Sequence, residues 1–445
     1  MAVNTNNVSS EHQSTSVPEQ SILEVYFVAL GQYNYDRAKE LVEKEREVVR
    51  SQSNSSTWVS MLSMLSRLAV AEKNYASLTY LNPKWLFGKK EQSMRLTYTG
   101  LVTDLSSFEI NGPGQPGAVQ QINSFLSHIC KQIHNFCEAR AETVEFYDKL
   151  CPMVNQRTDV DYGELLSIVD RLTATHGDHF HHPLLSPIKQ CFTLELEVLQ
   201  SLLKAHHHML DWLFLPTLLQ LHNVHSKLEN LGANIRFKEG KKSGVAIPSK
   251  TVGVPPLYQW LARFKAAQVS KFSLYFYGSL CKQADLKGHL SNLLIDYRAK
   301  IIAFHKKADA MNVSLVYDTN NAKEVFKGHG YHHPDSPHEV PTGLDSYPAI
   351  FSYPEEKPPI KLWPMVVMLL NSKAAELTDL DRVIYSFDKT QSMTYFVTRL
   401  EGRFSLVVIF NFKKSERDSY IKLFMQEMNL NLRGSNMFAG LGQKS

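Results

Sequence analysis

The sequence predicts a multi-domain protein, an N-terminal helical bundle followed by a C-terminal α+β domain with a mixed sheet. Before about residue 240, apolar residues recur at the 3.6-residue spacing of helices. Beyond it, short runs rich in β-forming residues occur, the clearest being 395–400 and 404–410. Between the two patterns, 236–256 is rich in Lys, Gly and Pro, which is typical of a linker. The change of period predicts two structural units.

The chain's composition fits a globular protein without a nucleic-acid partner. Its 445 residues are 43% hydrophobic and 21% charged, which is ordinary for folded domains. The net charge of +4 (48 basic minus 44 acidic residues) is too balanced to predict nucleic-acid binding. Five cysteines without a C-x-x-C pair favour reduced, buried thiols. No signal peptide or apolar run of about 20 residues is present, so we expect a cytoplasmic protein that reaches membranes only through partners.

The first half begins with a polar segment, residues 1–20, which we expect to be a disordered tail. A capping-box pattern at Ser21 predicts the start of the first helix, and 22–50 and 57–80 both have helical patterns. The Gly- and Pro-rich stretch 111–117 separates these helices from the ones that follow.

Two long helices then carry narrow apolar stripes. The first has Ile122, Leu126, Ile129, Ile133 and Phe136 at alternating spacings of four and three. The second has the same pattern from Phe192 to Leu213, and Pro216 should kink or break this helix before the stripe resumes at Leu221. Helices of this kind pack as an antiparallel bundle. We therefore assign residues 21–235 to a helical bundle domain.

The second half, residues 257–445, predicts the α+β domain. A helix at 257–269, a strand at 272–277, a helix at 285–310 and a strand at 313–317 would form a parallel crossover. After a long His- and Pro-rich loop at 328–359, a helix at 361–376 leads to three strands. These strands, at 382–387, 394–400 and 404–410, should be antiparallel because short turns join them. A capping box at Ser415 predicts the last helix.

Histidine clusters are the main candidates for chemistry. His176, His179, His181 and His182 form one, and His206, His207 and His208 another. Consecutive histidines on a helix point about 100° apart, and His206 takes a position of the apolar stripe. We therefore interpret it as a buried stripe residue rather than a zinc ligand. No recognised zinc or catalytic motif is present, so we assign no catalytic, cofactor or metal residues.

Cys130, His134 and Cys137 share one helix face by their spacing. This trio could contribute to a metal site, but a stripe that faces the core gives the same spacing, and cysteine is usually buried. We favour the core interpretation.

The loop at 328–359 is the strongest candidate for a contact with another protein. Loops of more than about 12–15 residues tend to be functional or disordered, and interfaces favour aromatic anchors. The four candidate anchors are Tyr331, Tyr347, Phe351 and Tyr353.

Three segments carry a resemblance to a known family: Asp211 to Gln220, Gly328 to Asp335, and the hairpin from Tyr395 to Phe410. In these segments, and over essentially its whole length, the chain resembles the KICSTOR subunit 2 family. The resemblance implies a non-enzymatic scaffold at the lysosomal surface. It implies contact with kaptin, an FG-GAP repeat protein, a very large scaffold subunit and the GATOR Rag GTPase-activating complex. The implied role is negative regulation of mTOR complex 1 during amino-acid or glucose starvation.

Three hypotheses follow from the sequence. The first is this scaffold, whose last helices and strands we also compare with a roadblock or longin-type module by fold analogy. The second is a metal-dependent hydrolase that uses the histidine clusters. The third is a self-associating protein, because the stripe from Phe192 to Leu231 could also form a homo-oligomer.

Overall fold

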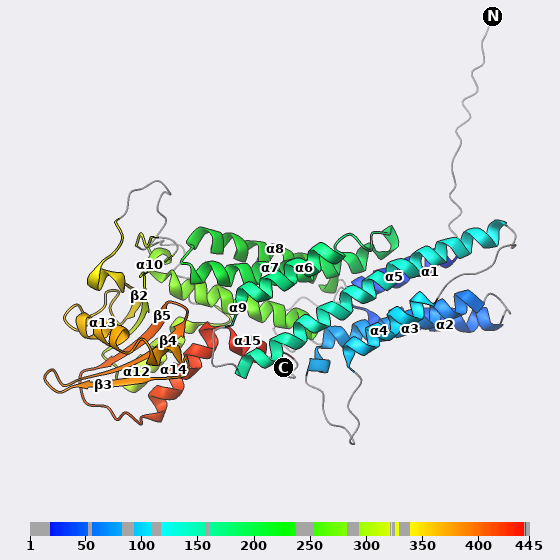
Figure 1. The fold of residues 1–445 in the computed structure, drawn as a ribbon. Helices are drawn as coiled ribbons and strands as arrows, with labels where there is room; N and C mark the ends of the chain where they lie inside the picture. The colour runs from blue at the N-terminus through cyan, green and yellow to red at the C-terminus, as the bar shows by residue number, and fades with distance from the viewer. Residues whose placement is uncertain are drawn as a thin grey trace, which may run out of the picture.

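The molecule is elongated, with long helices at one end and a β-sheet at the other (Figure 1). It is described here from a computed structural model. The structure describes residues 18–51, 56–81, 93–107, 117–155, 160–236, 253–282, 293–320, 322, 325–328, 339–439 and 441. Within these ranges no helix is both long and apolar enough to cross a bilayer.

The helical end, which we call the bundle, is formed by eight described helices that precede residue 237. They are α1 (Pro18–Gly31), α2 (Tyr35–Ser51), α3 (Ser56–Ser77), α4 (Met94–Ser106), α5 (Gly117–Leu150), α6 (Tyr162–His176), α7 (Ser186–Leu210) and α8 (Phe214–Arg236). Short 3-10 turns follow α3 and α5 and precede α7, at Thr79–Leu81, Cys151–Asn155 and Pro183–Leu185.

The first two helices differ from the prediction in their bounds. The region 22–50 is two helices, because Tyr33 adopts a left-handed backbone (φ 58°) that ends α1. Helix α1 begins at Pro18 rather than Ser21. Gly31 closes α1 where the backbone meets α7, since a Cβ there would lie 2.6 Å from Cβ of Pro187. Of the expected tail, residues 1–17 lie outside the described residues.

The two apolar stripes face the core as predicted. In α5 the residues from Leu126 to Phe136 on the stripe are buried, and in α7 so are Phe192, Leu196, Leu199 and Leu203. Helix α7 ends at Leu210, and α8 starts four residues later with Pro216 in its first turn. The break predicted at this proline is confirmed.

The predicted strand at 272–277 is wrong, because this segment is helical. Helix α9 runs over Pro256–Tyr275, and the short α10 follows at Tyr277–Leu280. The aromatic run has high β-propensity, but buried residues recur at helical spacing from Leu257 through Phe264 to Phe272. Packing on this continuous face decides the conformation over local propensity.

The sheet has five strands in the order β2-β1-β5-β4-β3, and every neighbouring pair is antiparallel. The mixed sheet and its parallel crossover are therefore wrong, because the crossover depended on the strand at 272–277. The strands at 313–317, 382–387, 394–400 and 404–410 are confirmed within one or two residues. The strand bounds are β1 (Asn312–Tyr317), β2 (Ala349–Tyr353), β3 (Ile384–Asp388), β4 (Met393–Glu401) and β5 (Phe404–Phe410).

Helices cover both faces of this sheet. Phe404, Leu406 and Val408 of β5 pack with α9, α12 and α14, whereas Val407 and Ile409 pack on the opposite face with α13. The covering helices are α12 (Tyr297–Ala308), α13 (Trp363–Ser372) and α14 (Ser419–Leu432), and α15 (Ser435–Ala439) returns to the bundle. Asp418, not Ser415, caps α14 by accepting from the backbone N–H of Tyr420 and Ile421.

Helix α9 belongs to both cores. Its first half, with Trp260 and Phe264, packs in the core of the bundle, and its second half, with Phe272 and Tyr275, packs under the sheet. The division into domains at 21–235 and 257–445 stays a prediction. Of the predicted linker 236–256, residues 237–252 lie outside the described residues.

Candidate interaction site

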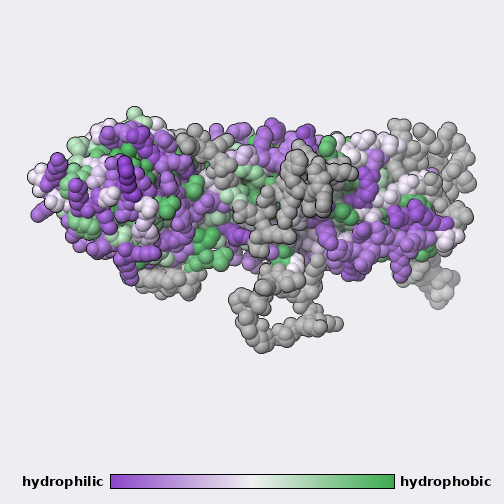
Figure 2. Space-filling model, turned by 90° about the horizontal axis from the view of Figure 1, so that it is seen from below, coloured by the Kyte–Doolittle hydropathy of each residue, from purple (hydrophilic) through white to green (hydrophobic). Residues whose placement is uncertain are grey.

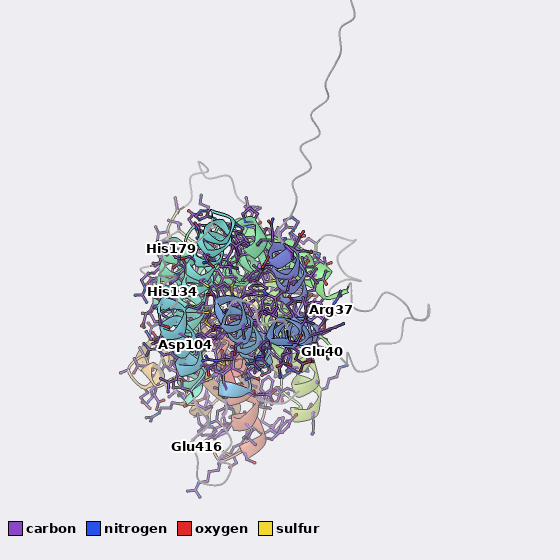
Figure 3. The ribbon with its side chains drawn as sticks, turned by 90° about the vertical axis from the view of Figure 1, so that its right-hand side faces the viewer. Arg37, Glu40, Asp104, His134, His179 and Glu416 are labelled. Carbon is purple, nitrogen blue, oxygen red and sulfur yellow. The ribbon has the colours of Figure 1, made fainter. Side chains whose placement is uncertain are left out.

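The first histidine cluster lies in the turn between α6 and α7, which α5 holds in place. Gln132 Oε1 of α5 accepts hydrogen bonds from the backbone N–H groups of His181 (2.7 Å) and His182 (3.2 Å). His182 Nδ1 in turn accepts from Leu184 N. His179 is exposed, on the side of the bundle opposite Arg37 in the end view of Figure 3. These contacts give the turn a structural role.

The predicted burial of His206 is confirmed, since its side chain is 0% exposed. Its two neighbours are partly exposed, and His207 Nε2 lies 3.7 Å from Asp211 Oδ2 one turn later. The ring centroids of His207 and His208 lie 6.3 Å apart, but His206 is in the core, so the three rings do not converge on one site. Among the described residues, no three His, Cys, Asp or Glu side chains are grouped so that they could hold a metal ion. The hydrolase alternative draws no support from this part of the chain.

Cys130 and Cys137 face the core, as predicted. Their side chains are 2% and 0% exposed. Burial raises the pKa of the Cys130 thiol to about 12, so it stays protonated at neutral pH. His134 turns away, with Nδ1 3.7 Å from Glu138 Oε2.

His206 belongs to a buried polar group between the bundle and the sheet. His206 Nε2 lies 3.0 Å from Glu401 Oε2 of β4, and Nδ1 lies 3.1 Å from Gln268 Nε2. Lys271 pairs with Glu401, whose Oε1 also accepts from the hydroxyl of Tyr275 at 2.6 Å. We call these five residues the junction cluster, since they join α7, α9 and β4.

The junction cluster holds one cation, one anion and a neutral imidazole. Burial, and then the charge of Lys271, lower the pKa of His206 to about 4. Burial alone would raise the pKa of Glu401, but Lys271 and His206 outweigh it and lower that pKa to about 2. The ring of Tyr162 of α6 stacks on the ring of His206, with 3.6 Å between the ring centroids. The site is closed to solvent, and its contacts hold the sheet on the bundle.

A second buried ionic group lies inside the bundle. Arg140 of α5 donates from Nη1 to Glu195 Oε2 at 2.8 Å and from Nε to Glu72 Oε1 at 3.2 Å. Although burial opposes it, these two carboxylates raise the pKa of Arg140 well above its usual value. Three tyrosine hydroxyls also donate to the two carboxylates. The bundle cluster is Glu72, Tyr75, Tyr98, Arg140, Tyr147 and Glu195.

The predicted anchors lie in different surroundings. Phe351 is buried in β2, a strand within the segment we expected to be a loop, and Tyr353 ends that strand half-buried. Tyr347 is buried with its hydroxyl 2.7 Å from Asn371 Oδ1. Tyr331 lies outside the described residues. The structure gives the first three a packing role, and their contact with a partner stays a prediction.

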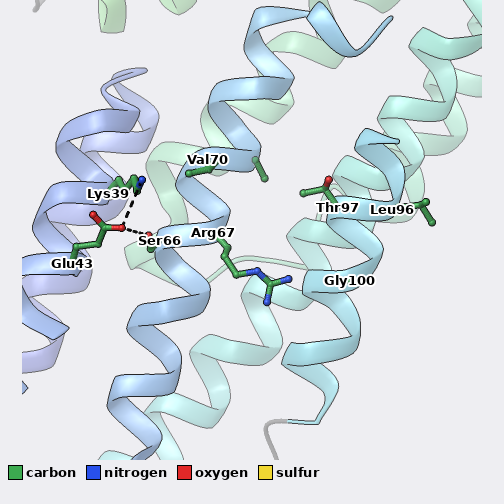
Figure 4. Close-up of a pocket in the computed structure, with 9 residues that line it drawn as sticks. Lys39, Glu43, Ser66, Arg67, Val70, Leu96, Thr97 and Gly100 are labelled. Carbon is green, nitrogen blue, oxygen red and sulfur yellow. Dashed lines mark hydrogen bonds and ion pairs between the residues drawn. The ribbon is translucent and has the colours of Figure 1, made fainter. Parts of the chain in front are cut away.

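A hollow at the surface of the bundle lies between α2, α3 and α4 (Figure 4). Its volume is about 400 Å³. Val70 and Leu96 are apolar yet 39% and 56% exposed, and Gly100 leaves the wall flat. We call it the bundle groove. Its nine lining residues are Lys39, Glu43, Ser66, Arg67, Val70, Ala71, Leu96, Thr97 and Gly100.

Charged side chains form the rim of the bundle groove. Glu43 Oε1 accepts from Ser66 at 3.0 Å and lies 3.7 Å from Lys39 Nζ, and Arg67 pairs with Asp104. An apolar floor with a polar rim is the usual anatomy of a protein interface. The view from below, the side on which α3 and α4 lie, shows a mostly hydrophilic surface with hydrophobic residues in small separate areas (Figure 2). Exposed apolar side chains beside charged ones make the groove a candidate contact surface.

The sequence did not lead us to predict the bundle groove or the buried role of Arg140. Arg140 has a sequence signal, because it stands one helical turn after Phe136 on the apolar stripe. The groove has none, since it depends on how three helices pack.

Comparison with known proteins identifies the family. A model of the family described as "KICSTOR complex C12orf66 like" matches residues 12–445. The chain belongs to this family. It is 40% identical over 430 residues to KICSTOR subunit 2 of Xenopus laevis, covering 95% of this chain and 96% of that protein. It is 39% identical over 432 residues to KICSTOR subunit 2 of Danio rerio, covering 95% of both. The resemblance to the KICSTOR subunit 2 family is thus confirmed.

Proposed function

We propose that this chain is a non-enzymatic scaffold subunit of the KICSTOR complex. Membership of a family whose members are named as subunits of that complex carries the proposal. Its proposed role within this complex is to help recruit the GATOR Rag GTPase-activating complex to the lysosomal surface. This recruitment would restrain mTOR complex 1 when amino acids or glucose are scarce. Kaptin, an FG-GAP repeat protein and a very large scaffold subunit are the proposed partners, and the membrane contact is indirect.

The bundle groove is the proposed contact with another KICSTOR subunit. We infer that the partner contributes a helix with an apolar face. Such a helix would bury the exposed side chains of Val70 and Leu96, while the charged rim stays in water.

A substitution in the groove tests this contact. Leu96→Glu places a charge on the wall of the groove that α4 contributes. It should weaken binding of the subunit about tenfold or more, because an anchor residue of an interface typically contributes over about 1.4 kcal/mol. The measurement is quantitative mass spectrometry of proteins that co-purify with the tagged chain. Leu423→Glu, on α14 and 64% exposed, is the matched control.

Two results would count against the proposal in different ways. Full recovery of all subunits with Leu96→Glu would exclude the groove as the contact. Absence of every other KICSTOR subunit from the unmodified chain would exclude membership of the complex.

We also propose that β1 to α14 form a roadblock or longin-type module. What supports the analogy is the connectivity of a two-stranded hairpin, a helix on one face, a three-stranded meander and a helix on the other face. A crystal structure compared with known modules tests it, and a different strand order would exclude it.

A further inference from the structure

A second cavity lies between the sheet and the last turn of α13. Its volume is about 90 Å³, whereas a single water molecule needs roughly 10–15 Å³ of such space. The cavity can therefore hold a group of several heavy atoms. Its polar lining is Asp318, Tyr347, Asn371, Arg399, Arg403 and Ser405.

Strand register explains why Arg399 lines this cavity. In β4 it lies opposite Ser405 of β5, which lies opposite Val316 of β1. Side chains alternate between the faces of a sheet, and the next residue, Leu400, packs with the core on the α12 and α14 face. Arg399 therefore stands on the α13 face, and the register irregularity that follows it lies at the cavity.

The guanidinium of Arg399 has donor capacity that the described residues leave unused. Its Nε is buried and has no hydrogen-bond partner among them. Arginine carries five N–H donors and no acceptor, and a buried donor without an acceptor destabilises the folded chain. A ligand with acceptor oxygens would remove this cost.

Three other polar residues of the lining, Tyr347, Arg403 and Asp318, already have hydrogen-bond partners. Tyr347 donates to Asn371 Oδ1, and Arg403 Nη1 donates to the carbonyl oxygen of Asn320. Asp318 Oδ1 accepts from both nitrogens of Asn320. With two arginines and one aspartate, the lining carries two positive charges and one negative charge, which is +1 in total.

We propose that this cavity binds a small oxyanion, a carboxylate or a phosphate group, with Arg399 as its principal ligand. Two oxygens on one atom match the planar fork of a guanidinium. Asp318 and the carbonyl end of α13 oppose an anion, so we expect the binding to be weak. The inference is independent of the proposed role in KICSTOR.

Thermal unfolding of the purified full chain tests the site. Inorganic phosphate and acetate are titrated separately, with sodium chloride at equal ionic strength as reference. We expect at least one of the two anions to raise the melting temperature in a saturable way. Arg399→Gln should lower the affinity of the chain for that anion about tenfold or more. Arg382→Gln, an arginine that pairs with Glu376 outside the cavity lining, is the matched control and should respond like the unmodified chain.

The response also separates the two ligand sources. A preference for phosphate indicates a phosphate ester, and a preference for acetate indicates a carboxylic acid. The proposal is overturned if neither anion raises the melting temperature more than sodium chloride does. It is also overturned if the Arg399→Gln variant, shown to be folded by its unfolding transition, has the same rise in melting temperature as the unmodified chain.

Discussion

The two buried ionic groups of this protein differ in charge and in position. The bundle cluster holds one arginine and two glutamates, an excess of one negative charge that three tyrosine hydroxyls help to stabilise. The junction cluster pairs one lysine with one glutamate around a neutral histidine. The first lies within one set of helices, and the second joins helices to a strand. A charged group inside one unit supports that unit, whereas one at a junction also fixes how two parts are held.

Removing the arginine from the bundle cluster should have the largest effect. Arg140→Met leaves Glu72 and Glu195 buried without a counter-charge, which should lower the free energy of unfolding by about 3–5 kcal/mol. Urea denaturation at pH 7 measures it. Arg67→Met removes an exposed partner of Asp104 and should cost less than about 1 kcal/mol. A similar small loss for Arg140→Met would show that the cluster does not depend on its cation.

The junction cluster should make stability depend on pH. The pKa of His206 is about 4 in the folded chain against an ordinary value of 6.5, so between these values the unfolded chain binds the extra proton. The free energy of unfolding therefore falls as pH drops from 6.5 to 4, by about 2 kcal/mol between pH 7 and 5 from this residue. Glu401, lowered from 4.5 to about 2, adds a further loss between these two values.

His206→Gln isolates the first of these contributions. Urea denaturation of both proteins at pH 7 and pH 5 should show a smaller loss in the variant, whatever its stability at pH 7. Equal losses in the two proteins would assign the pH dependence to other groups.

An exposed ion pair gives a reference for the two buried ionic groups. Lys300 of α12 lies 2.6 Å from Glu427 of α14, and both side chains are about half exposed. Lys300→Ala should therefore change the free energy of unfolding by less than about 1 kcal/mol, and less still in 0.5 M salt. A loss comparable to that of Arg140→Met would mean that burial does not separate the two kinds of pair.

Sequence periodicity predicted the long helices and four of the five strands, since each has its own local pattern. It failed at Phe272 to Tyr277, where six residues are too few to separate a period of two from one of 3.6. It found His206 because a polar residue stood on an apolar stripe, and it missed Arg140 at an equivalent place. The bundle groove and the cavity at Arg399 arise from contacts between distant segments, which periodicity does not encode.

The shared helix α9 has a mechanical consequence. Its 20 residues form a rod of about 30 Å, with one end fixed in each core. A helix anchored in both cores couples the position of the sheet to that of the bundle. Proteins attached to the bundle groove and to the sheet would therefore be held at a spacing to which the length of α9 contributes.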